Sequence, residues 1–197
     1  KEKCGQEAAF RLSESPIFLT NYFWQKLDDA SESIISQIKE MSDEELSKAI
    51  PANCNVPNDT KKPHFVAIDF GICQNENGNV IPQLIELQAF PSLFGFQKLF
   101  EEVITEVYPF LNELKNSLPK DEYIQKLKQV IVGNENPENV ILLEIYPEKQ
   151  KTAIDFVLTE QYLGIKTVCL TKIKKEGEKL FYENDGKLIQ INRIYNR

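Results

Sequence analysis

The spacing of apolar residues predicts a helical first part of the chain. Between residues 17 and 50, apolar side chains recur every three or four positions and so fall on one stripe of a helix: Phe23, Leu27, Ala30, Ile34, Ile35, Ile38 and Met41. Ser42 and Glu45 form an S-x-x-E pattern, so we expect a second helix to begin there. The proline- and asparagine-rich residues 51–63 predict a loop.

The pattern then changes from helical to extended. Residues 65–73 and 80–90 are rich in β-branched and aromatic side chains, and the sequence Asn75-Glu76-Asn77-Gly78-Asn79 lies between them. Asn-Gly between two such segments is a strong hairpin signal. The segment therefore predicts a β-hairpin, with a two-residue turn at Asn77-Gly78.

This turn fixes the pairing of the two predicted strands. It places Asp69 opposite Glu86, and the alternation of side chains puts Gln88 on the same face. The other face is then apolar, formed by Val66, Ile68, Phe70, Ile72, Ile85 and Leu87. A bulge at Pro82 would shift this register by one residue.

The second half of the chain predicts a βαβ unit between helices and a closing hairpin. An amphipathic helix follows Ser92, and another follows Pro119 and ends near Gly133. Residues 139–145 form a nearly continuous apolar run, typical of a strand buried on both faces of a parallel sheet. A helix from Thr152 to Gly164, with Asp155 in its capping box, and a strand over 166–170 complete the unit. Residues 179–182 and 187–195 predict the hairpin, turning at residues 184–186.

Composition narrows the functional classes. The net charge is −7, from 23 Lys and Arg against 30 Asp and Glu, which argues against nucleic-acid binding and against binding to anionic membranes. No apolar run reaches the roughly 20 residues of a membrane span, so we expect a cytoplasmic protein. The cysteines are scattered and His64 is the single histidine, so neither zinc-ligand spacing nor a disulfide framework is predicted.

The hairpin carries the candidate chemistry. Asp69, Glu86 and Gln88 offer three oxygen donors on one predicted surface, and Mg²⁺ often binds one or two carboxylates together with nucleotide phosphates. Ser92 can cap the following helix, whose free amides favour a nearby anion. From these residues alone, a polar face exposed to solvent is the simpler interpretation.

The order of the motifs resembles a known family. Asp69-Phe70, the asparagine-rich turn, residues 82–92 and Gly95-Phe96 are similar to the circularly permuted ATP-grasp proteins of the glutathionylspermidine-synthase-like group. That pattern is an aspartate strand, then L-x-E-x-N, then a stretch containing Pro, Ser and Gly. Residues 140–143, 160–165 and 187–197 follow in the same order and look like the Rossmann-like pre-ATP-grasp segment of the group.

The resemblance implies a mixed α/β fold. Residues 1–118 would form a helical segment plus the metal-bearing β-hairpin of an ATP-grasp-like lobe. Residues 119–197 would form the Rossmann-like pre-ATP-grasp segment with its terminal hairpin.

The resemblance also implies an ATP-dependent carboxylate–amine ligase, in which ATP phosphorylates a carboxylate and an amine displaces the acyl phosphate. Asp69, Glu86 and Gln88 match the Asp, Glu and Asn that bind Mg²⁺ in the family, with Gln88 one methylene longer than the family's Asn. Arg193 and Arg197 lie four apart on one side of a predicted strand, where they can hold a carboxylate or a phosphate; two side chains exposed to solvent at the strand end are an equally good interpretation. The implied cofactors are Mg²⁺ and ATP, and the implied partners are a small carboxylate and an amine.

The printed chain is expected to be the front portion of a longer enzyme, inactive alone. The sequence begins with Lys1 and its single methionine is Met41, and strand-like sequence runs almost to Arg197. The lysines that hold adenine and phosphates in the family come after the segment that matches residues 187–197. The alternative is a non-catalytic ligand-binding or protein-interaction module that retains the fold.

Overall fold

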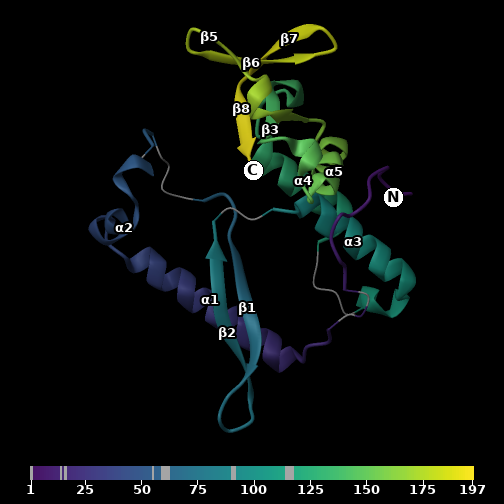
Figure 1. Ribbon diagram of the computed structural model, residues 1–197. Coiled ribbons are helices and arrows are strands. Elements are labelled where there is room, and N and C mark those ends of the chain that lie inside the picture. The colour runs from purple at the N-terminus through teal and green to yellow at the C-terminus, as the bar shows by residue number, and fades with distance from the viewer. Residues whose placement is uncertain are drawn as a thin grey trace. The chain divides into compact units, whose positions relative to one another are not determined.

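The computed structural model describes residues 2–13, 15, 17–54, 56–58, 63–89, 92–113 and 118–197. The chain divides into two compact units, Ser13–Pro91 and Lys1–Leu12 together with Ser92–Arg197. We call the first the inserted unit and the second the sheet unit. The fold is mixed α/β, and the described strands form small open sheets rather than a closed barrel (Figure 1). The boundary predicted at residues 118/119 falls inside the sheet unit.

The inserted unit consists of helices followed by a two-stranded antiparallel sheet. Its elements are α1 (Asn21–Glu40), α2 (Asp43–Ala49), a 3-10 turn (Ala52–Cys54), β1 (Ala67–Gln74) and β2 (Val80–Gln88). The predicted capping box of α2 is confirmed, because the Glu45 amide donates to Ser42 Oγ over 3.3 Å and the Ser42 amide donates to Glu45 Oε2 over 2.8 Å. These reciprocal bonds satisfy two amides that the first turn leaves without partners.

The sheet unit begins with helices and continues into two three-stranded sheets. Its longer elements are α3 (Phe94–Val107), α4 (Lys120–Ile131), β3 (Val140–Glu144), α5 (Ala153–Leu163), β4 (Lys166–Cys169), β5 (Lys174–Glu176), β6 (Lys179–Asn184), β7 (Lys187–Ile191) and β8 (Arg193–Asn196). Short 3-10 turns lie at Pro109–Glu113, Pro137–Asn139, Pro147–Lys149 and Leu170–Lys172.

The predicted βαβ unit is confirmed. β3 pairs in parallel with β4 and with β8, and α5 connects β3 to β4. Val140, Ile141 and Leu142 are each 0% exposed, as expected for a strand covered on both faces.

The predicted closing hairpin is partly wrong, because its second strand does not continue to Tyr195. The chain leaves the antiparallel β5-β6-β7 sheet after Ile191 and joins the parallel sheet as β8. At the change of sheet, the Asn192 amide donates to the Asn139 carbonyl over 2.8 Å, and Asn139 Nδ2 donates to the Gln190 carbonyl over 2.8 Å. The alternation of apolar and polar residues continues from β7 into β8 because both strands are half-buried, so the sequence does not reveal the change of sheet.

Different elements cover the two faces of the parallel sheet. Ile141 and Val168 pack in one cluster with Tyr182 and Ile191 from the antiparallel sheet. On the other face, Arg193 of β8 bonds to Val130 of α4, and Arg197, which follows β8, bonds to Thr152 at the start of α5. A second cluster joins α3, α5 and the first residues of the chain, where the Phe10 ring meets the Phe96 ring edge-on, with centroids 5.1 Å apart.

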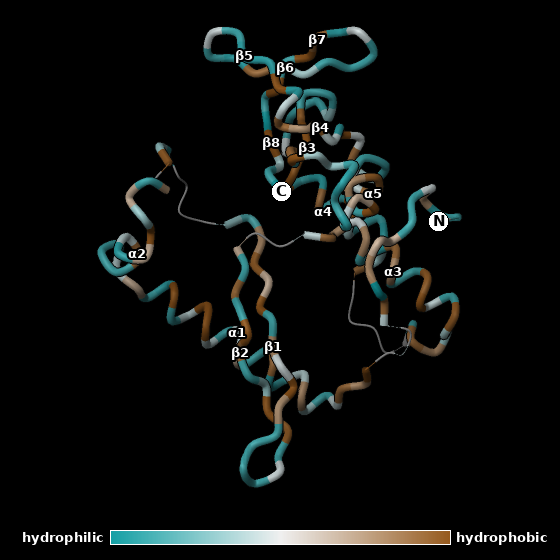
Figure 2. Tube along the Cα trace, in the orientation of Figure 1, coloured by the Kyte–Doolittle hydropathy of each residue, from teal (hydrophilic) through white to brown (hydrophobic). Residues whose placement is uncertain are grey.

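Hydrophobic positions are coloured brown along both units (Figure 2). No helix in the described ranges is both long enough and apolar enough to span a membrane.

Candidate cation site on the β1–β2 hairpin

The hairpin turn is one residue longer than predicted. Gln74 pairs with Val80, the Gly78 amide donates to the Asn75 carbonyl over 2.9 Å, and the Asn75 amide donates to the Asn79 carbonyl over 3.0 Å. Asn75 Oδ1 also accepts from the amides of Asn77 and Asn79. Gly78 has φ 79°, the left-handed conformation that a three-residue hairpin loop requires at this place. The predicted two-residue turn is therefore wrong.

A bulge in β2 nevertheless restores the predicted carboxylate pair. Phe70 pairs with Leu84, but Asp69 pairs with Glu86, so Ile85 is the extra residue of β2. The longer turn moves the register by one residue and the bulge moves it back. The bulge lies at Ile85 rather than at Pro82.

The bulge also changes which residue completes the apolar face. Ile85 was expected on the face of Phe70, yet its Cδ1 lies 3.7 Å from the position that a Cβ on Gly71 would take. Gly71 shares the face of Asp69, since side-chain direction alternates along a strand. Leu84 takes the place opposite Phe70 instead.

Asp69, Glu86 and Gln88 converge on one face of the hairpin. Gln88 Nε2 lies 3.3 Å from Asp69 Oδ2 and also donates to Glu86 Oε1. Asp69 and Glu86 are exposed and Gln88 is partly buried. The side-chain amide of Gln88 thus contacts both carboxylates, which would otherwise face each other with like charge.

This arrangement matches the oxygen chemistry of a hard cation. No group of three or more His, Cys, Asp or Glu side chains that could hold a metal ion occurs in the described part of the chain. The candidate donor set on the hairpin is two carboxylates and the side-chain amide of Gln88. Rotating the Gln88 amide by half a turn exchanges its nitrogen for its oxygen without moving the rest of the side chain. Mg²⁺ accepts one or two carboxylates with several waters, and these residues fit that demand.

The predicted capping of the next helix by Ser92 is wrong. Leu93 is the N-cap of α3, with φ 69°, and no side-chain cap comes from the residue itself. Asp155 of α5 supplies the acceptor instead, because its Oδ1 accepts from the Phe96 amide over 2.9 Å. The Asp155 carboxylate therefore lies at the first amides of α3, where the sequence predicted a bound anion.

The predicted capping of α5 by Asp155 is wrong for the same reason. Thr152 is the N-cap of α5 and makes no side-chain cap bond. Asp155 is 1% exposed, and burial raises the pKa of its carboxyl, while the amide bond from Phe96 and the charge of Arg197 act in the opposite direction. Burial also raises the pKa of Tyr123 and of Tyr195 to about 12, with a smaller contribution from Asp155.

Arg193 and Arg197 each have separate partners in the protein. Arg193 Nη2 donates to the Val130 carbonyl near the end of α4 over 2.7 Å. Arg197 Nη2 donates to Thr152 Oγ1 over 3.0 Å, and its Cζ lies 5.6 Å from the centre of the Phe156 ring. Residues four apart in a strand are separated by about 13 Å, so the two guanidinium groups do not converge on one anion.

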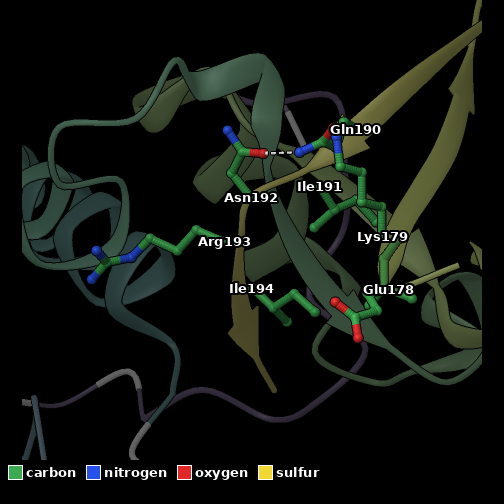
Figure 3. A pocket seen from close by; sticks show the side chains of 8 residues that line it. Glu178, Lys179, Gln190, Ile191, Asn192, Arg193 and Ile194 are labelled. Atoms are coloured by element: carbon green, nitrogen blue, oxygen red, sulfur yellow. Dashed lines mark hydrogen bonds between the residues drawn. The ribbon is translucent and has the colours of Figure 1, made fainter.

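An open pocket of about 580 Å³ was not foreseen from the sequence. It lies in the sheet unit, where β6 begins and β7 passes into β8, and is lined by Glu178, Lys179, Leu180, Gln190, Ile191, Asn192, Arg193 and Ile194. Gln190 Nε2 donates to Asn192 Oδ1 over 2.8 Å, and the guanidinium of Arg193 extends away from these side chains (Figure 3). The pocket contains none of the sequence-predicted metal ligands.

No family model matches the chain, and no curated protein matches it either.

Proposed function

We propose that Asp69, Glu86 and Gln88 bind Mg²⁺ together with the phosphates of ATP. The single observation that supports this is the side-chain cluster on the hairpin. Asp69 pairs with Glu86 across the two strands, and the Gln88 amide contacts both carboxylates. The resemblance stated above extends the proposal to an ATP-dependent carboxylate–amine ligase of the permuted ATP-grasp type. In this proposal the inserted unit contributes to the metal-binding lobe, and β3-α5-β4 belongs to the Rossmann-like segment.

Each residue has a distinct part in this proposal. Asp69 and Glu86 supply negative charge from two neighbouring strands, and Gln88 supplies a neutral oxygen after its amide rotates. Bound Mg²⁺ would stabilise the charge of phosphate oxygens during phosphoryl transfer. Arg193 and Arg197 would contribute to a phosphate or carboxylate site only after releasing Val130 and Thr152, so we assign them a secondary part.

Calorimetric titration of the full chain with MgCl₂, and then with ATP in the presence of Mg²⁺, tests the proposal. We expect Asp69→Asn and Glu86→Gln each to weaken Mg²⁺ binding at least about tenfold, which is about 1.4 kcal/mol. Glu76→Gln is the matched control, because Glu76 is an exposed carboxylate in the turn of the same hairpin. Equal affinities in all three variants would overturn the proposed site.

The chain alone is expected not to turn over ATP. The sequence contains no G-x-x-x-x-G-K-[ST] phosphate loop, and the amides at the start of α3 already hold Asp155. Phosphate release from Mg–ATP, with and without added carboxylates and amines, measures this. Turnover by the purified chain that is lost in Asp69→Asn would contradict the expected inactivity while supporting the site.

A non-catalytic interaction module is the second candidate. Large apolar side chains of the inserted unit are exposed, among them Tyr22 (72%), Trp24 (54%), Leu84 (51%) and Ile85 (68%). Exposed apolar side chains mark a site that contacts another molecule when they form one contiguous patch. Absence of Mg²⁺-dependent nucleotide binding in the titration above would favour this candidate.

A further inference from the structure

Four buried side-chain polar atoms of the sheet unit lack hydrogen-bond partners among the described residues, and three of them concern us here. Within the described residues, neither Asp155 Oδ2, nor Tyr195 OH, nor Arg197 Nε makes a hydrogen bond. Buried polar atoms in proteins almost always have a partner, and that partner is often an internal water molecule. These atoms belong to neither the hairpin site nor the open pocket.

The three residues meet where β8 ends and α5 begins. The Asp155 amide donates to the Thr152 carbonyl over 2.9 Å, while Arg197 Nη2 donates to Thr152 Oγ1 over 3.0 Å. The Arg197 amide donates to the Leu143 carbonyl over 3.1 Å, so the strand pairing with β3 continues past Asn196. Tyr195 and Arg197 therefore lie two apart on one side of this strand.

The electrostatic environment agrees with this placement. The charges of Asp155 and Arg197 both act on the Tyr195 hydroxyl, and the charge of Arg197 acts on Asp155. The geometry is the stronger evidence, because Arg197 and Asp155 both bond to Thr152, and Tyr195 precedes Arg197 by two residues on the same side of the strand. The fourth buried oxygen without a partner, Thr167 Oγ1, is in β4, with Leu142 of β3 between it and Tyr195 in the register.

We infer that one water molecule is bound between Asp155 Oδ2, Tyr195 OH and Arg197 Nε. Asp155 Oδ2 needs a donor, Arg197 Nε–H needs an acceptor, and the Tyr195 hydroxyl can donate. One water donates to the carboxylate and accepts from the other two groups. A single molecule thereby satisfies all three atoms, with the number of partners that internal waters usually have.

The opposite charges of Asp155 and Arg197 favour a neutral ligand between them. A cation there would be repelled by the Arg197 guanidinium, and an anion would be repelled by the Asp155 carboxylate. A neutral molecule that both donates and accepts is compatible with both groups. Water is the smallest molecule with these properties.

The water connects three elements that are distant in sequence. It joins the end of β8 to α5 and, through Asp155 Oδ1 and the Phe96 amide, to the first turn of α3. It is a positioning ligand, because it holds the Asp155 carboxylate whose Oδ1 accepts from the Phe96 amide in the first turn of α3.

A crystal structure of the full chain at about 1.5 Å resolution tests the inference directly. We expect one density peak at about 2.6–3.2 Å from all three atoms. A direct hydrogen bond between Asp155 Oδ2 and Tyr195 OH or Arg197 Nε, with no such peak, would overturn it. A peak in contact with only one of the three atoms would overturn it as well.

Water relaxation dispersion in solution provides a second test, because it counts long-lived internal waters. We expect Tyr195→Phe to lose the contribution of one long-lived water relative to the wild-type chain. Tyr182→Phe is the matched control, since this buried tyrosine donates directly to the Glu138 carbonyl over 2.8 Å. Arg197→Lys, which keeps the charge but removes Nε, replaces Tyr195→Phe if that variant does not fold. The same long-lived contribution in the cluster variant and in Tyr182→Phe would contradict the inference.

Discussion

The inserted unit and the sheet unit bury very different amounts of apolar surface. Phe23 is the only apolar side chain among the described residues of Ser13–Pro91 that is buried, at 6% exposure. The sheet unit buries Val140, Ile141 and Leu142 completely, together with most of the apolar side chains of α5. Hydrophobic burial is the main stabilising contribution to folding, so we expect the sheet unit to be the more stable of the two.

The polar side chains of the two units also differ in how strongly they are tied to the rest of the fold. In the sheet unit, Asp155, Arg193 and Arg197 are bonded to backbone or hydroxyl groups of neighbouring elements. In the inserted unit, Asp69 and Glu86 remain exposed, and the hydrogen-bond partner of their carboxylates among the described residues is the rotatable amide of Gln88 in the same sheet. A side chain that already stabilises its own fold is less free to bind a ligand. The comparison therefore supports the hairpin, rather than the arginines of β8, as the candidate site.

Truncating one leucine in each unit gives the largest contrast. Leu158 of α5 is 1% exposed, so we expect Leu158→Ala to lower the free energy of unfolding by about 3–4 kcal/mol through lost burial and a cavity. Leu84 of β2 is 51% exposed, and Leu84→Ala should lower it by less than about 1 kcal/mol. Urea unfolding followed by circular dichroism measures both. Equal losses would mean that the two units are stabilised alike and would end the comparison.

Removing the carboxylate of Asp155 should have the next largest effect. Asp155→Ala leaves the Phe96 amide without its acceptor and Arg197 without its nearby negative charge, so we expect a loss of about 2–3 kcal/mol. Asp155→Asn keeps an oxygen for the amide and should cost less. Urea unfolding at neutral pH compares the two variants, and a larger loss for Asn than for Ala would contradict the capping role.

The pH dependence of Asp155 follows from the direction of its pKa shift. The carboxyl has a pKa above 3.8 in the folded chain, so the folded state holds the proton more tightly than the unfolded state. The stabilisation from the protonated form is complete below pH 3.8 and is lost as the pH rises through the raised pKa. The stability of the wild type relative to Asp155→Asn should therefore fall with rising pH in that window. A rise would mean that Arg197 and the amide bonds outweigh burial.

The helices and the parallel sheet could be predicted because their signals are local. The stripe of α1, the capping box of Ser42 and Glu45, and the apolar run of β3 each depend on residues close in sequence. The pairing of Asp69 with Glu86 was also predicted, but from a turn and a register that were both wrong. Two shifts of one residue cancelled, because the bulge at Ile85 offsets the longer turn.

What the sequence could not predict depends on contacts between distant residues. Asp155 lies three residues after Thr152, which resembles a capping box, yet its carboxylate bonds to Phe96, 59 residues away. The other buried residues of α5 are nearly all apolar. A charged residue among them was the signal in the sequence that Asp155 bonds to another element. The change of sheet at Asn192 likewise depends on Asn139, which the alternating pattern of residues 187–195 does not reveal.

The smallest effect concerns one glycine in each unit. A Cβ on Gly95 would lie 3.0 Å from Leu158 Cβ and 3.3 Å from Asp155 Oδ1, so α3 and α5 can approach this closely only with glycine there. We expect Gly95→Ala to lower the free energy of unfolding by about 1–2 kcal/mol, because the helices must separate. At Gly71 of β1 the nearest atom would be Cys73 Sγ at 3.4 Å, an ordinary contact, and Gly71→Ala should stay within about 0.5 kcal/mol of the wild type. Thermal unfolding of both variants measures the difference in stability. A larger loss of stability in Gly71→Ala than in Gly95→Ala would show that the inserted unit is the more tightly packed at these two positions.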